Sequence, residues 1–255
     1  MDLGIHQRVA VVTGGSGGIG AGIVRCLARE GARVAVGYHT DRTAAEHLVQ
    51  SMDSGPEACM VFHHDLCAPQ TIQRAVEAVL ERWGRVDILV ACAWQSAGWP
   101  QPDVLPESTS AEAWQVQLRA NVEGSACVVQ AVLPAMRAAG WGRIVLVSSG
   151  AAEDGAPGLE HYAAAKAALH GISRSLARSV GPAGILVNTV MPSFVATERH
   201  RHSIPPQVFE RIAAQTPTRR LATEEDVAQL VAFLVSDANR AITGSEVRVS
   251  GGMRM

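Results

Sequence analysis

A tyrosine and a lysine four residues apart are the first side chains in the sequence that could do chemistry together. Tyr162 and Lys166 begin a stretch whose spacing predicts a helix over Tyr162–Val180, so both side chains point to one helix face. A free tyrosine has a pKa of about 10, and a nearby ammonium group lowers it toward the range of efficient proton exchange. Ser149, at the end of a predicted strand, could hydrogen-bond a substrate oxygen. These residues predict acid–base chemistry at an oxygen atom.

A glycine-rich turn near the N-terminus predicts where a phosphate group binds. The segment Thr13-Gly14-Gly15-Ser16-Gly17-Gly18-Ile19-Gly20 follows the first predicted strand and opens the first predicted helix. Gly14 permits the tight turn, Gly18 lets the backbone approach a pyrophosphate, and Gly20 lets the helix pack against the strand. The helix N-terminus attracts the phosphate charge. A glycine triplet alone could be a flexible turn, but its place at a strand–helix junction favours a dinucleotide site.

The spacing of this turn, T-G-x-x-x-G-I-G, resembles that of the short-chain dehydrogenase/reductase family. The resemblance continues along nearly the whole chain in Asp65-Leu66, in Asn121-Val122-Glu123-Gly124, in the series Ser149, Tyr162 and Lys166, and in Met191-Pro192 through Thr197. It implies a nicotinamide cofactor, which supplies the hydride while the protein supplies position and charge. It also implies that Lys166 holds the nicotinamide ribose and that Asn121 extends a proton path from Lys166 through water.

The resemblance therefore implies two sets of site residues. The catalytic set is Asn121, Ser149, Tyr162 and Lys166. The cofactor-binding set is Gly14, Ser16, Gly18, Ile19, Gly20, His39, Thr40, Asp65, Leu66, Ala93, Tyr162, Lys166, Pro192, Val195 and Thr197.

The chain departs from the family pattern after the fourth predicted strand. Ala91-Cys92-Ala93-Trp94 stands where the family has N-N-A-G. Ala93 keeps a small side chain beside the cofactor, but Trp94 replaces a glycine close to the expected path of the nicotinamide ribose. The substitution could narrow the cleft or contact substrate. Relatives that dock acyl carrier protein often carry basic residues at the positions of Gly140 and Ala183, which favours a specialised substrate here.

Alternating short apolar runs and longer amphipathic stretches indicate how the chain positions these groups. The predicted strands are Arg8–Thr13, Arg33–Gly37, Met60–His63, Val86–Ala91, Arg143–Ser148, Ile185–Val190 and Glu246–Val249. The predicted helices are Gly20–Glu30, Thr43–Ser51, Pro69–Trp83, Ala111–Ala138, Tyr162–Val180 and one from the N-cap Thr223 to Ser236. This alternation predicts one α/β domain over residues 1–255, a Rossmann-type doubly wound parallel sheet of about seven strands with helices on both faces.

Composition narrows the functional class. The net charge of -2 is spread without a basic stripe, so the sequence favours neither nucleic acid nor a membrane surface as a partner. The five cysteines form no C-x-x-C pair and the histidines show no metal-ligating spacing, so we expect no metal site. No segment resembles a signal peptide or a membrane span, and we expect a cytoplasmic protein.

Three further expectations concern the cofactor, a lid and the assembly. Tyr38 stands where NAD-preferring relatives have an aspartate, and His39, Thr40 and Arg42 could bind a 2′-phosphate, so we expect NADPH rather than NADH. The stretch 193–217 is a predicted substrate lid, interrupted at Ser203-Ile204-Pro205-Pro206. The resemblance implies a homotetramer through the helices around Asn121 and Tyr162, which carry the small residues Ala126, Ala131, Ala164, Ala167 and Ala168.

The predicted function is an NADPH-dependent ketoreductase. Its nearest general resemblance is to 3-oxoacyl-carrier-protein reductases and biosynthetic ketoreductases. The substrate is then a small-molecule carbonyl, either free or attached to a carrier. Two alternatives stay open: an NAD-dependent secondary alcohol dehydrogenase, and a dinucleotide-binding sensor without catalysis. The intact Ser149, Tyr162 and Lys166 favour an enzyme, and the altered Ala91–Trp94 stretch is the support for a sensor.

Overall fold

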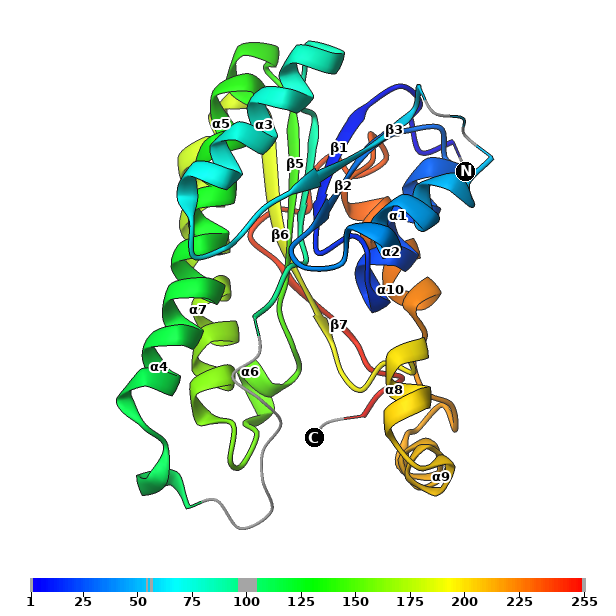
Figure 1. Cartoon of the computed structure of the whole chain (residues 1–255), viewed down its shortest axis with the longest axis vertical. Helices are drawn as coiled ribbons and strands as arrows, with labels where there is room; N and C mark the ends of the chain where they lie inside the picture. The colour runs from blue at the N-terminus through cyan, green and yellow to red at the C-terminus, as the bar shows by residue number, and fades with distance from the viewer. Residues whose placement is uncertain (1, 54, 56, 96–104, 254–255) are drawn as a thin grey trace.

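A seven-stranded parallel sheet forms the centre of the molecule (Figure 1). The computed structural model describes residues 2–53, 55, 57–95 and 105–253. The strands are β1 (Val9–Thr13), β2 (Arg33–Tyr38), β3 (Cys59–His63), β4 (Ile88–Ala91), β5 (Gly142–Val147), β6 (Ile185–Pro192) and β7 (Glu246–Val249). Their order is β3-β2-β1-β4-β5-β6-β7, and every neighbouring pair is parallel. The predicted doubly wound α/β sheet is confirmed.

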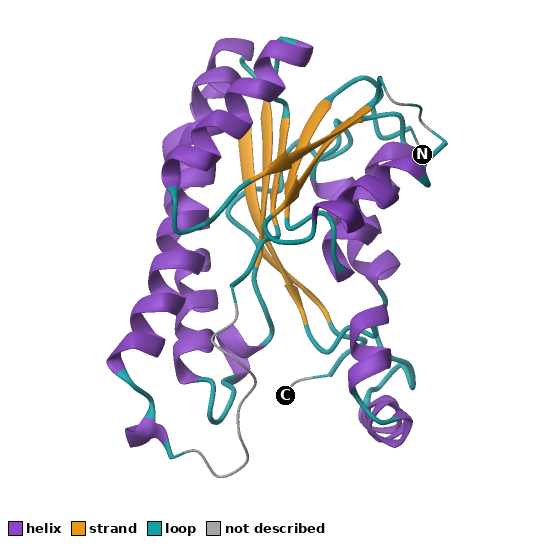
Figure 2. Cartoon of the chain, viewed as in Figure 1, coloured by secondary structure: helices purple, strands orange, loops and turns teal. Residues whose placement is uncertain are grey.

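Helices cover both faces of the sheet, as Figure 2 shows. The helices are α1 (Gly18–Arg29), α2 (Arg42–Gln50), α3 (Pro69–Trp83), α4 (Ala111–Leu118), α5 (Gly124–Ala139), α6 (Ala151–Asp154), α7 (Glu160–Val180), α8 (Glu198–Ser203), α9 (Pro206–Gln215) and α10 (Glu224–Leu234). One core cluster joins α1 and α10 to the sheet through residues such as Ile23, Leu27 and Val231. The other joins α3, α5 and α7 through residues such as Val79, Val132 and Leu169. The core is aliphatic, as a sheet buried on both faces requires.

Two predicted segments differ from the structure. The predicted helix Ala111–Ala138 is divided into α4 and α5 by a π-helical turn over Arg119–Glu123. A π-helical turn adds one residue to the helical repeat and is frequent at functional sites. The apolar spacing of the sequence does not mark such a turn, so the sequence predicted one continuous helix. The stretch Pro192–Pro217, in which the sequence predicted no helix, contains α8 and α9. The break predicted at Ser203–Pro206 is confirmed, because α8 ends at Ser203 and α9 begins at Pro206.

The buried His64 gives a testable property of the fold. Its ring lies 5.5 Å from that of Phe62, and burial lowers its pKa to about 4. The unfolded chain takes up this proton near pH 6.5 and the folded chain only near pH 4, so stability falls as the pH falls through this window. We expect this residue to cost about 3 kcal/mol of unfolding free energy at pH 4 relative to pH 7.

Urea titrations at several pH values check this expectation. His64→Asn should flatten the pH dependence between pH 7 and 4, whatever its effect on stability at pH 7. His63→Asn, at the exposed neighbouring position, is the matched control for the substitution itself. An unchanged pH dependence in His64→Asn would contradict the assignment.

Candidate active site

The strand order reverses between β1 and β4, and in open parallel sheets ligands bind at the carboxyl ends of the strands beside such a reversal. Here the turn after β1 meets the segment after β4. The Thr13 hydroxyl accepts hydrogen bonds from the backbone N–H groups of Cys92 and Ala93, each at 3.1 Å. A Cβ on Gly14 would lie 2.8 Å from the Cα of Ala93, so a glycine is required at this contact. The predicted tight turn at Gly14, with φ of 63°, is confirmed.

The glycine-rich turn leaves backbone donors free at the start of α1. Helix α1 begins at Gly18, so the N–H groups of Gly18, Ile19 and Gly20 precede its first internal hydrogen bond, from Ala21 to Gly17. A Cβ on Gly20 would lie 2.1 Å from the carbonyl oxygen of Gly14, which confirms the close packing predicted there. These free donors at a helix N-terminus suit the pyrophosphate of a dinucleotide.

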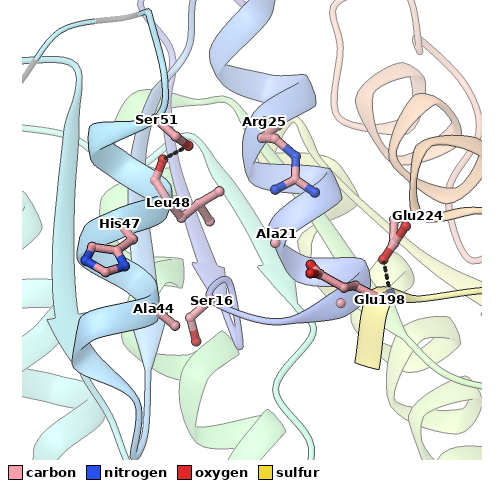
Figure 3. A pocket seen from close by; sticks show the side chains of 10 residues that line it. Ser16, Ala21, Arg25, Ala44, His47, Leu48, Ser51, Glu198 and Glu224 are labelled. Atoms are coloured by element: carbon pink, nitrogen blue, oxygen red, sulfur yellow. Dashed lines mark hydrogen bonds between the residues drawn. The ribbon is translucent and has the colours of Figure 1, made fainter. Parts of the chain in front are cut away.

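A pocket of about 340 Å³ borders this turn between α1 and α2 (Figure 3). Ser16 lies at its floor beside Ala44, while Arg25 of α1 and Glu198 of α8 extend into it from the other side. Ser16 thus faces open space next to the free N–H groups of α1. The pocket places Ser16 where it could contact the sugar or phosphate of a bound dinucleotide.

The ends of β2 and β3 bring the predicted adenosine-binding residues together. The His39 Nε2 atom lies 3.8 Å from Oδ2 of Asp65, and the Asp65 Oδ1 atom accepts a hydrogen bond from the backbone N–H of Cys67 at 2.8 Å. Leu66 is buried, and its carbonyl oxygen would lie 2.6 Å from a Cβ on Gly124. The glycine of the N-V-x-G motif therefore lets the helical segment around Asn121 approach the end of β3.

Ser149 and Tyr162 face each other beyond the end of β5. Burial raises the pKa of the Tyr162 phenol and outweighs the influence of the nearby Ser149 hydroxyl, which favours the ionised form. The sequence predicted a pKa lowered by Lys166, so in the protein without cofactor this expectation is wrong. The reason is burial of the phenol, to which Lys166 makes no resolved contribution; the Lys166 ammonium donates to the carbonyl oxygen of Val147 at 2.9 Å.

Lys166 is itself deeply buried, with 5% of its surface exposed. Burial lowers its pKa to about 8. Burial likewise raises the pKa of the nearby Cys92 thiol to about 11, so the thiol offers Lys166 no compensating negative charge at neutral pH. A buried lysine with a lowered pKa, one helical turn after a partly buried tyrosine, indicates a functional arrangement more than a stabilising one.

The Asn121 side chain holds the segment after β4. Its Oδ1 atom accepts a hydrogen bond from the backbone N–H of Gln95 at 2.9 Å, and its Nδ2 atom donates to the Gln95 carbonyl oxygen at 3.0 Å. Nδ2 also donates to Oε1 of Gln117 at 2.7 Å. The amide is therefore engaged within the protein, and the predicted proton path through Asn121 remains a prediction.

Comparison with known proteins identifies the family. Residues 14–254 match the family described as enoyl-(acyl carrier protein) reductase. The chain is 35% identical over 253 residues to the 3-oxoacyl-[acyl-carrier-protein] reductase FabG of Escherichia coli, covering 99% of this chain and 100% of the relative. The chain is a short-chain dehydrogenase/reductase. It is also 32% identical over 249 residues to the acetoacetyl-CoA reductase of Cupriavidus necator, covering 98% and 99% of the two chains.

A solved short-chain dehydrogenase/reductase, described as a glucose/ribitol dehydrogenase from Brucella melitensis, has the same fold. It superposes with a TM-score of 0.89 at 28% identity and covers 100% of both chains. The protein is accordingly an NAD(P)-dependent oxidoreductase that acts on CH–OH and C=O groups. The predicted family and enzyme class are confirmed.

The segment after β6 closes one side of this short-chain dehydrogenase/reductase site. The Pro192 carbonyl oxygen accepts a hydrogen bond from the backbone N–H of Gly150 at 2.9 Å, which places the segment beside Ser149. Val195 is buried and pairs with Ala222. Thr197 caps α8, and its methyl group would lie 3.4 Å from a Cβ on Gly18. Thr197 therefore lies opposite the free donors of the glycine-rich turn.

Several residues of the site could not be assigned from the sequence. Ser148 donates to the Lys166 carbonyl oxygen at 2.9 Å and lies at the same distance from Nε2 of His170, so it holds α7 against β5. Gln117 is buried beneath Asn121. Its spacing of four residues from Asn121 was the one available signal, since such residues share a helix face.

The described part of the chain has neither a cluster of metal ligands nor a membrane-spanning helix. Among these residues, no group of three or more histidine, cysteine, aspartate or glutamate side chains is placed to hold a metal ion. Within the same ranges, no helix has both the length and the apolar character needed to cross a bilayer.

Proposed function

We propose that the protein is an NADPH-dependent ketoreductase whose substrate is a 3-oxoacyl-like compound or a ketone of specialised metabolism. The observation that carries the proposal is the placement of Tyr162 beside Ser149, one turn from the buried Lys166 and at the same sheet edge as the free donors of α1. The relatives named as reductases of 3-oxoacyl and acetoacetyl thioesters support the carbonyl class. The substrate is either free or attached to a carrier.

The side chains have distinct parts in this proposal. Bound nicotinamide would supply the hydride to the carbonyl carbon. Ser149 would donate a hydrogen bond to the carbonyl oxygen and hold it beside Tyr162. The Tyr162 hydroxyl would give its proton to that oxygen, and the remaining phenolate would accept a hydrogen bond from Ser149. Lys166 would hold the nicotinamide ribose, and its positive charge would favour the phenolate.

The residues present suit a dinucleotide. The free N–H groups of Gly18, Ile19 and Gly20 would hold the pyrophosphate, with Thr197 opposite them. Asp65 and Leu66 would contact the adenine ring, and Ser16, His39 and Thr40 the adjoining ribose. Ala93 would let the cofactor pass the end of β4. Pro192 and Val195 would border the nicotinamide.

The stretch 193–217 would act as a substrate lid within this single domain. Its aromatic side chains pack together: the Phe194 ring stacks on His200 at 5.4 Å and meets Phe209 edge-on at 5.6 Å. This packing makes α8 and α9 a unit that could move as one body. A homotetramer through α5 and α7 remains part of the proposal, supported by the exposed Ala164 on α7.

Cofactor preference is the first prediction from this function. The Asp41 carboxylate, which could have bound a ribose, instead caps α2 by accepting a hydrogen bond from Ala44 N–H at 2.8 Å. Tyr38 ends β2 where an acid would favour NADH. We expect kcat/KM for NADPH to exceed that for NADH by at least about tenfold, about 1.4 kcal/mol in transition-state binding.

A substitution at the same strand end sharpens the test. Tyr38→Asp introduces a carboxylate that accepts hydrogen bonds from the ribose hydroxyls and repels a 2′-phosphate. The NADPH to NADH ratio should fall by about tenfold or more in this variant. A wild-type ratio favouring NADH by tenfold would overturn the assignment.

Oxidation of each reduced cofactor against a panel of carbonyl compounds tests the function itself. The panel should contain acetoacetyl-CoA, a 3-oxoacyl carrier-protein thioester, and cyclic and aryl ketones. Turnover of a carbonyl supports the ketoreductase. Turnover confined to secondary alcohols with NAD would instead show an alcohol dehydrogenase. Tight cofactor binding without turnover of any panel member would favour a sensor.

A further inference from the structure

Trp94 lies directly against the candidate acid–base residue. Its ring centroid is 5.2 Å from that of Tyr162, with the planes inclined at 67° in an edge-to-face contact. The indole is nevertheless 43% exposed. An aromatic ring that touches Tyr162 on one side and leaves much of its surface uncovered borders the place where the carbonyl must lie.

A buried amide fixes the orientation of this indole. Gln117 is 1% exposed, and its Oε1 atom accepts hydrogen bonds from Trp94 Nε1 at 3.4 Å and from Asn121 Nδ2 at 2.7 Å. Its Nε2 atom donates to the Gln95 carbonyl oxygen at 3.0 Å. Asn121 holds the Gln95 N–H and carbonyl as well. The backbone beside Trp94 and the indole N–H are thus held by the same pair of amides.

The hydrogen bond to Gln117 gives Trp94 a defined position, and the Tyr162 hydroxyl takes no part in that hydrogen bond. The indole N–H is directed toward Gln117, so the part of the ring left for a substrate is apolar. A substituent on a carbonyl held by Ser149 and Tyr162 would meet this ring. Flat aromatic groups gain from such contacts beyond simple burial, whereas a flexible chain must lose conformational freedom to cover the same surface.

We propose that Trp94 is a specificity-determining residue, which makes the site select ketones bearing a flat ring next to the carbonyl over open-chain 3-oxoacyl thioesters. Gln117 is its positioning residue. The proposal rests on the proposed function, because it takes Tyr162 as the group that meets the carbonyl.

The test compares kcat/KM for 1-tetralone, a fused-ring aryl ketone, with kcat/KM for acetoacetyl-CoA. Trp94→Gly should lower the tetralone to acetoacetyl-CoA ratio by tenfold or more, while Trp94→Phe should keep it within about threefold. Gln117→Met removes both acceptor contacts at similar volume and should also lower the ratio. Trp83→Phe, on α3 with its indole bound to the Glu57 carbonyl oxygen, is the matched control and should leave the ratio unchanged. A tetralone to acetoacetyl-CoA ratio that is unaltered in Trp94→Gly would overturn the proposal, even if kcat/KM falls equally for both substrates.

Binding without turnover separates this inference from the proposed function. In the Tyr162→Phe background with NADPH present, tetralone should quench tryptophan fluorescence, and the added Trp94→Phe substitution should remove most of that quenching. The added Trp83→Phe substitution should retain it. Quenching that persists without Trp94 would overturn the proposal even if the ketoreductase activity is real. Quenching lost with Trp94 supports its place beside the ligand even if no carbonyl is turned over.

Discussion

Tyr162→Phe is expected to lower kcat for carbonyl reduction by about 10³-fold, in the range that a positioned acid–base group supplies. The phenylalanine ring keeps the edge contact with Trp94, now 5.2 Å between centroids, so the shape of the site is retained. What is lost is the hydroxyl beside Ser149 that gives the proton in the proposed reaction. The affinity for NADPH should stay within a few-fold, because the N–H groups that we propose hold the pyrophosphate lie on α1.

Initial rates of NADPH oxidation and a fluorescence titration of the cofactor measure these two quantities. Circular dichroism confirms that the variant is folded. Near-wild-type turnover in Tyr162→Phe would exclude this residue as the acid. A parallel loss of cofactor affinity would show that the substitution disturbs binding and not proton transfer.

The chain contains only two tyrosines, so the ionisation of Tyr162 can be followed directly. The difference between wild-type and Tyr162→Phe absorbance titrations of phenolate isolates this group. Burial raises its pKa above 10 in the protein alone. If Lys166 turns toward the site when the cofactor binds, the positive charge should lower that pKa. An unchanged titration on adding NADP would argue against this coupling.

The parts of the site that the sequence predicts are those encoded by short spacing. Gly14 and Gly20 are required because a Cβ at either position would collide with backbone, and such demands appear as glycines at fixed intervals. Tyr162 and Lys166 share a helix face for the same local reason. The seven strands follow from apolar runs that a doubly covered sheet needs, and right-handed crossovers place the connecting helices on its faces.

The remaining features depend on contacts between distant segments. Trp94 follows β4 and reaches Tyr162 of α7, 68 positions later in the chain. The π-helical turn at Arg119–Glu123 places Asn121 against Gln95. The spacing of apolar residues along the helix does not predict this contact. The helices α8 and α9 are short and carry polar residues and prolines. Such segments resemble loops in sequence because tertiary packing, more than intrinsic propensity, stabilises them.

Lys166 shows how the position of one side chain can oppose stability. The folded protein holds the ammonium in a buried place with the Val147 carbonyl oxygen at 2.9 Å, and burial lowers the pKa from the ordinary lysine value of 10.5 to about 8. Keeping this charge buried at neutral pH costs about 3 kcal/mol of folding stability. An arrangement of this kind is expected where function requires the charge.

Lys166→Met is therefore expected to lower activity strongly and to change how stability depends on pH. Turnover should fall by about 10³-fold, as for Tyr162→Phe, because in the proposed mechanism Lys166 holds the nicotinamide ribose and its charge favours the phenolate. In the wild type, the unfolded chain binds the lysine proton up to pH 10.5 and the folded chain only up to about pH 8. Unfolding takes up a proton between these values, so wild-type stability should rise with pH there, and Lys166→Met should lack this rise.

Urea unfolding of both proteins from pH 7 to 10 measures the effect, since other titrating groups cancel in the comparison. The wild type should gain about 3 kcal/mol relative to Lys166→Met across the window from pH 8 to 10.5, most of it by pH 10. Near pH 7 the variant loses the stabilising hydrogen bond to Val147, but it also loses the destabilising buried charge. Because the cost of the buried charge is larger than the gain from the hydrogen bond, we expect Lys166→Met to be more stable than the wild type at this pH. Parallel stability curves across the window would mean that Lys166 keeps its proton in the fold, and its buried charge would then need a partner other than the Val147 carbonyl.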